Sequence, residues 1–191
     1  MGRDHAGPRG RLLALAVGAA LAGALRLQGR RWWCRCGRPA PWVSDARGPH
    51  NSRHLADPYT FTHVPHGLLL YALLRTLRGR FSADSRFALA VVLEAGWEVF
   101  ENTETVIRHY RRTTAAQGYV GDSVANSLGD VAAAAAGYEA ASRLSPRGSA
   151  ALFLGSEAAA LAMCRDCFVL NVLTAVTPMK AVRRRRSSGR R

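Results

Sequence analysis

The sequence lacks a long uncharged hydrophobic run, the plainest mark of a membrane-spanning helix. Such a helix needs roughly 18 or more nearly uncharged apolar residues. The longest uncharged runs here, 12–25, 58–74 and 167–179, are shorter than that. Two further apolar stretches, 87–106 and 121–141, are interrupted by carboxylates. Hydropathy alone therefore fits a soluble helical protein and a membrane protein equally well.

Cysteine and acidic residues are also scarce. Four cysteines in 191 residues exclude a disulfide-dense secreted scaffold. The 13 Asp and Glu stand against 27 Lys and Arg, a net charge of +14, and Lys180 is the only lysine. With 48% hydrophobic residues the chain is too apolar to be disordered. We find no phosphate-binding glycine loop, no Gly-x-Ser-x-Gly motif and little sign of strands.

The placement of the charges favours a membrane protein over a soluble one. Arginines gather between the apolar stretches, at 75–86, 108–112 and 143–147, whereas the stretches themselves hold carboxylates and almost no cation. A soluble amphipathic helix would carry both signs along its outer face. A spanning helix instead places its long cationic side chains at its ends, where they reach water. We therefore predict an all-α, multi-pass transmembrane bundle of four or five helices.

We expect a single membrane domain over 1–191, with a Pro-, Gly- and Arg-rich loop at 28–61 and a basic solvated tail at 183–191. The expected helices are 12–27, 62–77, 86–107, 120–142 and 149–180. The first could instead be a cleaved signal peptide, because it follows a basic N-terminus. The distribution of basic residues places the tail in the cytoplasm, although a signal anchor at the first helix would invert this topology.

Polar side chains recur at helical spacing inside these segments. Glu94, Glu98 and Glu101 follow an i, i+4, i+7 pattern, which places three carboxylates on one stripe. The other polar groups are Tyr59, His63 and His66; Asp122, Asn126 and Asp130; and Glu157, Arg165, Asp166 and Asn171. If consecutive helices are antiparallel neighbours, these groups meet at one end of the bundle.

The register of such a bundle places particular side chains side by side. His66 is expected level with Trp97, and Glu101 within a turn of Asp122 and Asn126. Four polar clusters from distant parts of the chain are thereby expected at one site.

Carboxylates and imidazoles in an apolar bundle are costly unless they are paired, bound to metal or exposed to water. Both are ligand types of carboxylate–histidine metal centres. The candidate ligands of a divalent metal ion are His63, His66, Glu98, Glu101 and Asp122. Glu98 and Glu101 are also the candidate catalytic residues. The alternative is a structural network of ion pairs and hydrogen bonds with Arg108, Arg165 and the asparagines.

The four cysteines form two pairs, Cys34-x-Cys36 and Cys164-x-x-Cys167. Together they could supply a four-thiolate zinc site, and the second pair could have a redox role. The second pair could equally be small hydrophobic residues of a helix.

Basic and aromatic residues alternate at 30–33 and 108–112, a pattern found in nucleic-acid-binding proteins. Trp, Tyr and Arg also concentrate at membrane edges, where they meet lipid headgroups. We favour membrane lipids as partners and expect no nucleic acid, while protein partners stay open.

Six segments, 34–37, 51–67, 94–103, 108–111, 118–130 and 165–171, resemble the motifs of uncharacterised protein family 0314. The resemblance extends over about 10–182, with departures at Pro58 and Cys167. It implies a small multi-pass protein of the bacterial inner membrane and supplies no activity. The polar positions in its motifs are Asn51, His54, Asp57, Tyr59, Glu94, Asn102, Asp122, Ser123, Asn126, Asp130, Arg165, Asp166 and Asn171.

Three kinds of function are compatible with these features. A metal-dependent hydrolase acting on a lipid or envelope precursor would use the histidines as ligands and one glutamate as general base. A small transporter or proton-coupled carrier would use the acids as a relay. A structural or assembly factor would use the polar groups only for helix packing. No feature of the sequence selects a substrate.

Overall fold

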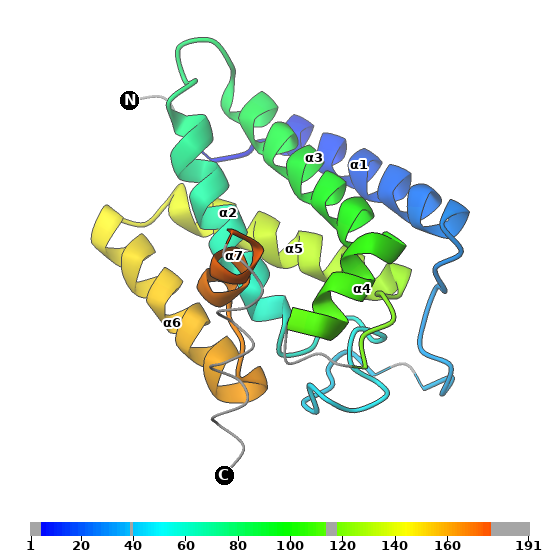
Figure 1. The fold of residues 1–191 in the computed structure, drawn as a ribbon. Helices are drawn as coiled ribbons and strands as arrows, with labels where there is room; N and C mark the ends of the chain where they lie inside the picture. The colour runs from blue at the N-terminus through cyan, green and yellow to red at the C-terminus, as the bar shows by residue number, and fades with distance from the viewer. Residues whose placement is uncertain (1–4, 39, 114–117, 177–191) are drawn as a thin grey trace.

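The computed structural model describes residues 5–38, 40–113 and 118–176 (Figure 1). This part of the chain is helical and contains no strand, which confirms the all-α part of the prediction. Its helices are α1 (Pro8–Leu27), α2 (Thr60–Arg75), α3 (Ala83–Glu101), α4 (Glu104–Thr113), α5 (Val124–Ala141), α6 (Pro146–Cys164) and α7 (Phe168–Val176).

Helices α2 and α5 form the central pair of the bundle. They make the most extensive contact between any two helices, α3 packs on both of them, and α1 packs against α3 (Figure 1). Helix α6 lies against α2. A Cβ atom on Gly67 would collide with the carbonyl oxygen of Ala134, and one on Gly137 with that of Val64. The two backbones therefore touch, which only glycine permits.

The hydrophobic core lies beside this contact. Tyr138 of α5 is fully buried, and its ring meets Tyr71 of α2 and Phe87 of α3 edge-on, with ring centroids 5.2 and 5.4 Å apart. Aromatic rings prefer such edge-to-face packing. This aromatic cluster fixes the relative positions of the three helices that carry most of the polar residues.

The structure divides two of the expected helical segments. The segment 86–107 breaks after Glu101, where the side-chain amide of Asn102 donates to the Glu98 carbonyl and to Asp122. The segment 149–180 breaks at Arg165, whose φ of 58° is left-handed. The carboxylate of Glu157 then accepts hydrogen bonds from the N–H groups of Phe168 and Val169 and so caps α7. Side chains that bond to the backbone end both helices.

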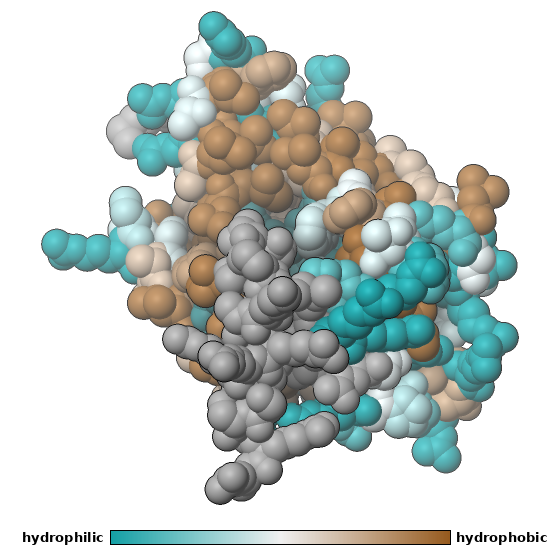
Figure 2. All heavy atoms as spheres, in the orientation of Figure 1, coloured by the Kyte–Doolittle hydropathy of each residue, from teal (hydrophilic) through white to brown (hydrophobic). Residues whose placement is uncertain are grey.

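Among the described helices, only α1 is long and apolar enough to cross a bilayer. The multi-pass arrangement expected from the charge pattern therefore stays a hypothesis. The tail 183–191 lies outside the described residues. Apolar side chains nevertheless gather on one face of the molecule, over the region of α2 and α3 (Figure 2). Leu73 and Phe100 there are 61% and 54% exposed.

The glycine contact gives a first prediction. We expect Gly67→Ala to lower the free energy of unfolding by about 1–3 kcal/mol, the usual cost of overpacking, because its methyl group has no space against α5. The matched control is Gly96→Ala in α3, where a Cβ atom meets nothing within 4 Å. That variant should be neutral or slightly stabilising. Thermal unfolding of the purified proteins measures both, and equal effects would contradict the close α2–α5 contact.

Candidate functional site

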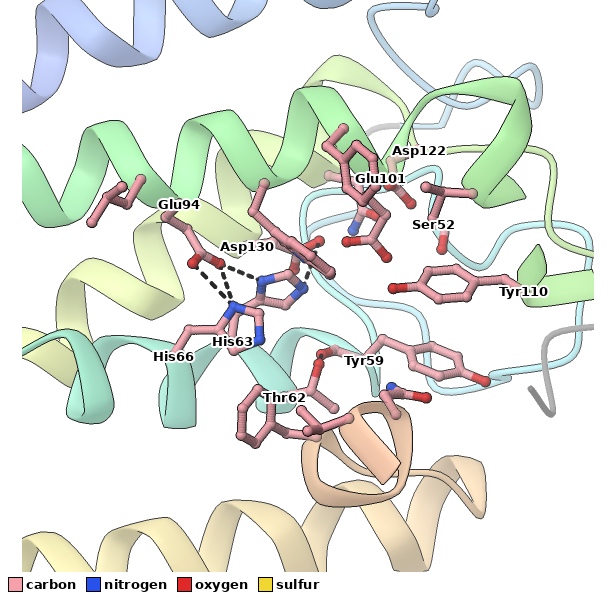
Figure 3. Close-up of a pocket in the computed structure, with 18 of the residues that line it drawn as sticks. Ser52, Tyr59, Thr62, His63, His66, Glu94, Glu101, Tyr110, Asp122 and Asp130 are labelled. Atoms are coloured by element: carbon pink, nitrogen blue, oxygen red, sulfur yellow. Dashed lines mark hydrogen bonds and ion pairs between the residues drawn. The ribbon is translucent and has the colours of Figure 1, made fainter. Parts of the chain in front are cut away.

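A partly open cavity of about 830 Å³ lies between α2, α3, α4, α5 and α7. Its outer wall is apolar and includes Leu69, Leu73 and Leu93. Its inner wall carries carboxylates, imidazoles and hydroxyls, most of which Figure 3 labels. The volume lies within the range of roughly 300–1,000 Å³ typical of small-molecule sites. The cavity thus suits an amphiphilic ligand, with an apolar part outside and a polar part inside.

Glu94 of α3 links two histidines of α2. Its Oε1 atom lies 2.7 Å from His63 Nδ1 and 2.9 Å from His66 Nδ1 (Figure 3). A carboxylate only accepts hydrogen bonds, so we assign a proton to each Nδ1 atom. In the neutral rings each Nε2 atom then keeps its lone pair. A carboxylate that orients imidazoles in this way is the usual outer partner of metal-binding histidines.

Glu98, one turn further along α3, is more deeply buried than Glu94. It is 1% exposed, and neither carboxylate oxygen has a hydrogen-bond partner within the described structure. The basic side chain beside it is that of His63, whose Nδ1 atom lies 3.6 Å from Oε1 of Glu98. A buried carboxylate without partners is costly by several kcal/mol. This position therefore favours a cation or a proton.

Asp130 of α5 approaches the same imidazole from its other edge. Its Oδ2 atom lies 3.9 Å from His63 Nε2 (Figure 3). Its Oδ1 atom is buried without a hydrogen-bond partner in the described part of the chain. Three carboxylates from two helices, those of Glu94, Glu98 and Asp130, thus surround one ring.

Two groups of side chains here have the spacing of a metal site. One contains His63, His66 and Glu94, and the other His63, Glu98 and Glu101; within each group one ligand atom per residue lies within 4.8 Å of the others. The first group is already joined by hydrogen bonds. The second has unpartnered oxygens, and its Glu101 lines the cavity. The second group is the better candidate for a cation.

A hydrogen-bonded network holds Asp122 at the inner end of the cavity. Its carboxylate accepts from the Tyr119 hydroxyl at 2.6 Å and from the Asn102 amide at 3.0 Å, and its N–H donates to Asn102 Oδ1. Burial, together with the charge of Asp122, raises the pKa of Tyr119 well above its ordinary value. Tyr119 therefore stays a hydrogen-bond donor at neutral pH.

Asp57 joins the loop before α2 to the start of α5. Its carboxylate accepts from the N–H groups of Ser52 and Tyr59, both at 2.8 Å, and from the Asn126 amide at 3.3 Å. Burial raises the pKa of Asp57, and the two backbone hydrogen bonds act against that rise. The Ser123 hydroxyl caps α5 by accepting from the Asn126 N–H. The loop and the helix thus position each other.

The structure brings together most of the polar residues expected at the site. Those that line the cavity are Tyr59, His63, His66, Glu94, Glu101, Asp122, Asn126, Asp130 and Asn171. Those that are buried but do not line it are His54, Asp57, Glu98, Asn102, Ser123 and Asp166. The ring of His66 lies 6.1 Å from that of Trp97, in line with the expected register.

Other expected members lie elsewhere. Arg165 is exposed at the end of α6, and Arg108 pairs with Glu104 at the surface, 3.9 Å away. Neither cation is placed to neutralise the buried acids, whereas Asn102 and Asn126 do bond to buried carboxylates, so only the asparagine part of the expected structural network is seen. Asn51 and His54 belong to the loop before α2. The two cysteine pairs do not share a cluster in the described residues, so the four-thiolate site is not seen either.

Sequence reasoning did not place Ser52, Thr62, Tyr110 and Tyr119 in the cavity wall. The position of Tyr119, three residues before Asp122, could have indicated that it lies near the site. No spacing in the sequence indicates Tyr110, because it reaches the cavity only through the break between α3 and α4.

Comparison with known proteins places the chain among relatives without an assigned activity. Residues 25–188 match the model of a family described as "Protein of unknown function (DUF2585)". A "UPF0314 protein" of Paracoccus denitrificans is 40% identical over 81% of this chain and 80% of its own. Those of Sphingopyxis alaskensis and Rhizobium meliloti are 37% and 41% identical, over 91% and 82% of this chain and 93% and 80% of theirs. No solved structure gives a significant match.

These relatives confirm the resemblance to uncharacterised family 0314 found from the motifs. All three are bacterial proteins, and their names give no activity. The geometry of the site is therefore the basis for any functional inference.

The network at Asp122 gives a second prediction. We expect Tyr119→Phe to lower the free energy of unfolding by about 1.5–3 kcal/mol, because it removes a hydrogen bond to a buried carboxylate. The effect should largely vanish in an Asp122→Ala background, which leaves no side-chain oxygen to accept from Tyr119, and a double-mutant cycle measured by denaturant unfolding tests this. Additivity within about 0.5 kcal/mol would show that the two side chains do not interact.

Proposed function

We propose that this chain, which belongs to the DUF2585 family of unknown function, is an integral membrane hydrolase. It uses a divalent metal ion to cleave an ester or phosphoester bond of a lipid or lipid-linked envelope precursor. The observation that carries the proposal is the unpartnered carboxylate of Glu98, which is buried beside His63, a residue that lines the cavity.

The apolar outer surface supports a location in the bacterial inner membrane. Leu12 and Leu15 of α1, Leu73 of α2 and Leu154 of α6 are each more than 60% exposed. Large contiguous apolar patches are rare on soluble monomers and indicate membrane or protein contact. Arg75, Arg78 and Arg80 are exposed at the end of α2 and in the turn before α3, where they would meet headgroups. By the distribution of basic residues, the tail 183–191 would be cytoplasmic.

The walls of the cavity indicate the class of substrate. Leu69, Leu73 and Val172 line it and also form part of the apolar surface, so an acyl chain could enter from the lipid side. The ester or phosphate group would then reach the inner end, where Tyr110 lies. A phenolic hydroxyl is a donor suited to an anionic oxygen, whereas that of Tyr119 already donates to Asp122.

The chemistry follows from the arrangement of three side chains. His63 and Glu98 would hold the ion. When bound, the ion would lower the pKa of a water molecule and polarise the substrate. Glu101, which faces the cavity, accepts a proton as the water oxygen bonds to the carbonyl carbon or phosphorus. The alcohol oxygen then leaves with that proton. Glu94 keeps His63 in the orientation that ligation needs.

Metal binding is the first test of this proposal. Mn²⁺ is the probe, because carboxylate and imidazole ligands suit it and thiolates do not. We expect one Mn²⁺ per chain in the purified protein, followed by electron paramagnetic resonance. Glu98→Gln should weaken binding at least tenfold, whereas Glu104→Gln, in a surface ion pair, should leave it unchanged. Equal binding by wild type and Glu98→Gln would contradict the assignment.

Turnover is the second test. Cells with and without the gene should differ in one lipid or envelope-precursor pool, and the wild-type gene should restore it. We expect Glu101→Gln to bind Mn²⁺ as the wild type does but to lose about 10²–10⁴-fold in rate, the usual contribution of a general base. A variant that restores the pool fully would exclude Glu101 as the base. A pool that never changes would favour a carrier or an assembly factor.

A further inference from the structure

A second cluster of metal-ligating side chains lies in the loop before α2, apart from the cavity. It contains Cys34, Cys36, His50 and His54, and one ligand atom from each lies within 4.8 Å of all the others. Cys34 Sγ is 3.2 Å from His50 Nδ1, and Cys36 Sγ is 3.6 Å from His54 Nε2. None of these four residues lines the cavity.

The distances match those of a tetrahedral zinc site. With Zn–S near 2.3 Å and Zn–N near 2.0–2.1 Å, neighbouring sulfur and nitrogen ligands lie about 3.5 Å apart. The two measured sulfur–nitrogen distances, 3.2 and 3.6 Å, bracket that value. Two thiolates and two imidazoles are also a standard ligand set of structural zinc. The geometry points to a zinc ion bound by Cys34, Cys36, His50 and His54, which closes the loop between α1 and α2.

The local backbone is shaped for this set of ligands. Gly37 has a φ of 69° and its N–H bonds to the Cys34 carbonyl, so the chain turns tightly directly after Cys36. That turn directs both thiols to the same side. His50 and His54 follow with three residues between them, within the spacing found in zinc sites. The ring of Trp33 packs edge-on against His54 at 5.7 Å and limits its movement.

Burial distinguishes this cluster from an exposed collection of ligands. His54 is 3% exposed and Cys34 is 8% exposed, whereas Cys36 and His50 lie on the solvent side. One histidine and one thiol thus anchor the ion from inside. The other two ligands close the site from outside, and they provide a route for the ion to enter. All four cysteines of the chain are free thiols, so Cys34 and Cys36 are available as ligands.

The loop needs such a crosslink. Among its described residues, 28–38 and 40–59, the loop contains no helix, and the regular pairing there is the bridge between Trp42 and Ala56. Ordering so long an irregular segment costs conformational entropy at every residue. A zinc ion that joins 34–36 to 50–54 would offset part of that cost, because metal binding is then coupled to folding.

The same loop builds one end of the cavity. The N–H groups of Ser123 and Val124, at the start of α5, donate to the carbonyls of Ser52 and Arg31. Ser52 also lines the cavity, and Asp57 accepts from Asn126. The zinc ion would therefore be structural, and its loss should loosen the loop that supports the candidate site.

Cobalt substitution in the full-length purified protein tests the site directly. Thiolate ligands give Co²⁺ an intense near-ultraviolet charge-transfer band, which carboxylate and imidazole ligands cannot give. We expect one equivalent of Co²⁺ to develop that band and one equivalent of Zn²⁺ to abolish it. The cavity site contains no thiol, so this readout is independent of Mn²⁺ binding there. The absence of a band in reduced wild-type protein would overturn the inference, as would recovery of a Cys34–Cys36 disulfide after purification under reducing conditions.

Matched variants identify the ligands. Cys34→Ser and His54→Ala should each lose the band, and zinc affinity should fall at least a hundredfold. Cys164→Ser and Cys167→Ser remove thiols from the other pair and should keep it. A band that survives in Cys34→Ser but disappears in Cys164→Ser would assign the metal to the wrong pair and reject the proposal.

Proteolysis tests the structural role without any substitution. Arg35, Arg47 and Arg53 are trypsin sites within the loop. We expect removal of zinc from the wild type by a chelator to speed cleavage at these sites at least tenfold, and added zinc to restore protection. Cleavage at Arg147, in α6, should not change at first. Identical loop cleavage with and without zinc would show that the ion does not order the loop.

Discussion

The shared hydrogen bonds of Glu94 with His63 and His66 determine how the rest of the site is arranged. These contacts join α2 to α3 at 2.7–2.9 Å in a region where both helices are buried. They also fix the orientation of the two rings, and so the direction in which each Nε2 atom points. Because Glu94 already accepts a hydrogen bond from each Nδ1 atom, neither Nδ1–H group is left to bond Glu98. Among the described residues, the site therefore holds more acidic groups than its basic groups can neutralise.

The excess of buried negative charge at this site favours a bound cation. A buried ion without a partner costs several kcal/mol, and a typical domain has a net stability of only about 5–15 kcal/mol. If Glu98 and Asp130 were both charged and unpaired, the cost of burying them would equal a large part of that net stability. A divalent ion held by His63 and Glu98 would remove this cost at Glu98. The glycine contact between α2 and α5 contributes by bringing Asp130 within 3.9 Å of the same ring.

Much of this arrangement could be predicted from the sequence, because helical spacing and antiparallel packing are local rules. Two predictions follow from the 3.6-residue period of a helix. One is the stripe of Glu94, Glu98 and Glu101, and the other is the position of His66 beside Trp97. The breaks at Asn102 and Arg165 could not be predicted in this way. They depend on side chains that bond to backbone groups far along the chain, as Asn102 does with Asp122 and Glu157 with Phe168. Tyr110 reaches the cavity only because of the first break.

The cysteines show a different limit. Cys34 and Cys36 could be recognised as possible ligands, but the sequence offered the second cysteine pair as the obvious partner. The loop instead turns back so that His50 and His54 face them. Irregular loops have no period from which such a meeting could be foreseen. The spacing of His50 and His54 was the only local sign of it, and it is weak alone.

A crystal structure of the protein grown with Mn²⁺, with anomalous diffraction data, tests the central claim most directly. The account predicts one anomalous peak within bonding distance of His63 and Glu98, near 2.0–2.3 Å, with Glu94 still bound to both Nδ1 atoms. An empty position there, with the Glu98 carboxylate hydrogen-bonded to another protein group, would contradict it.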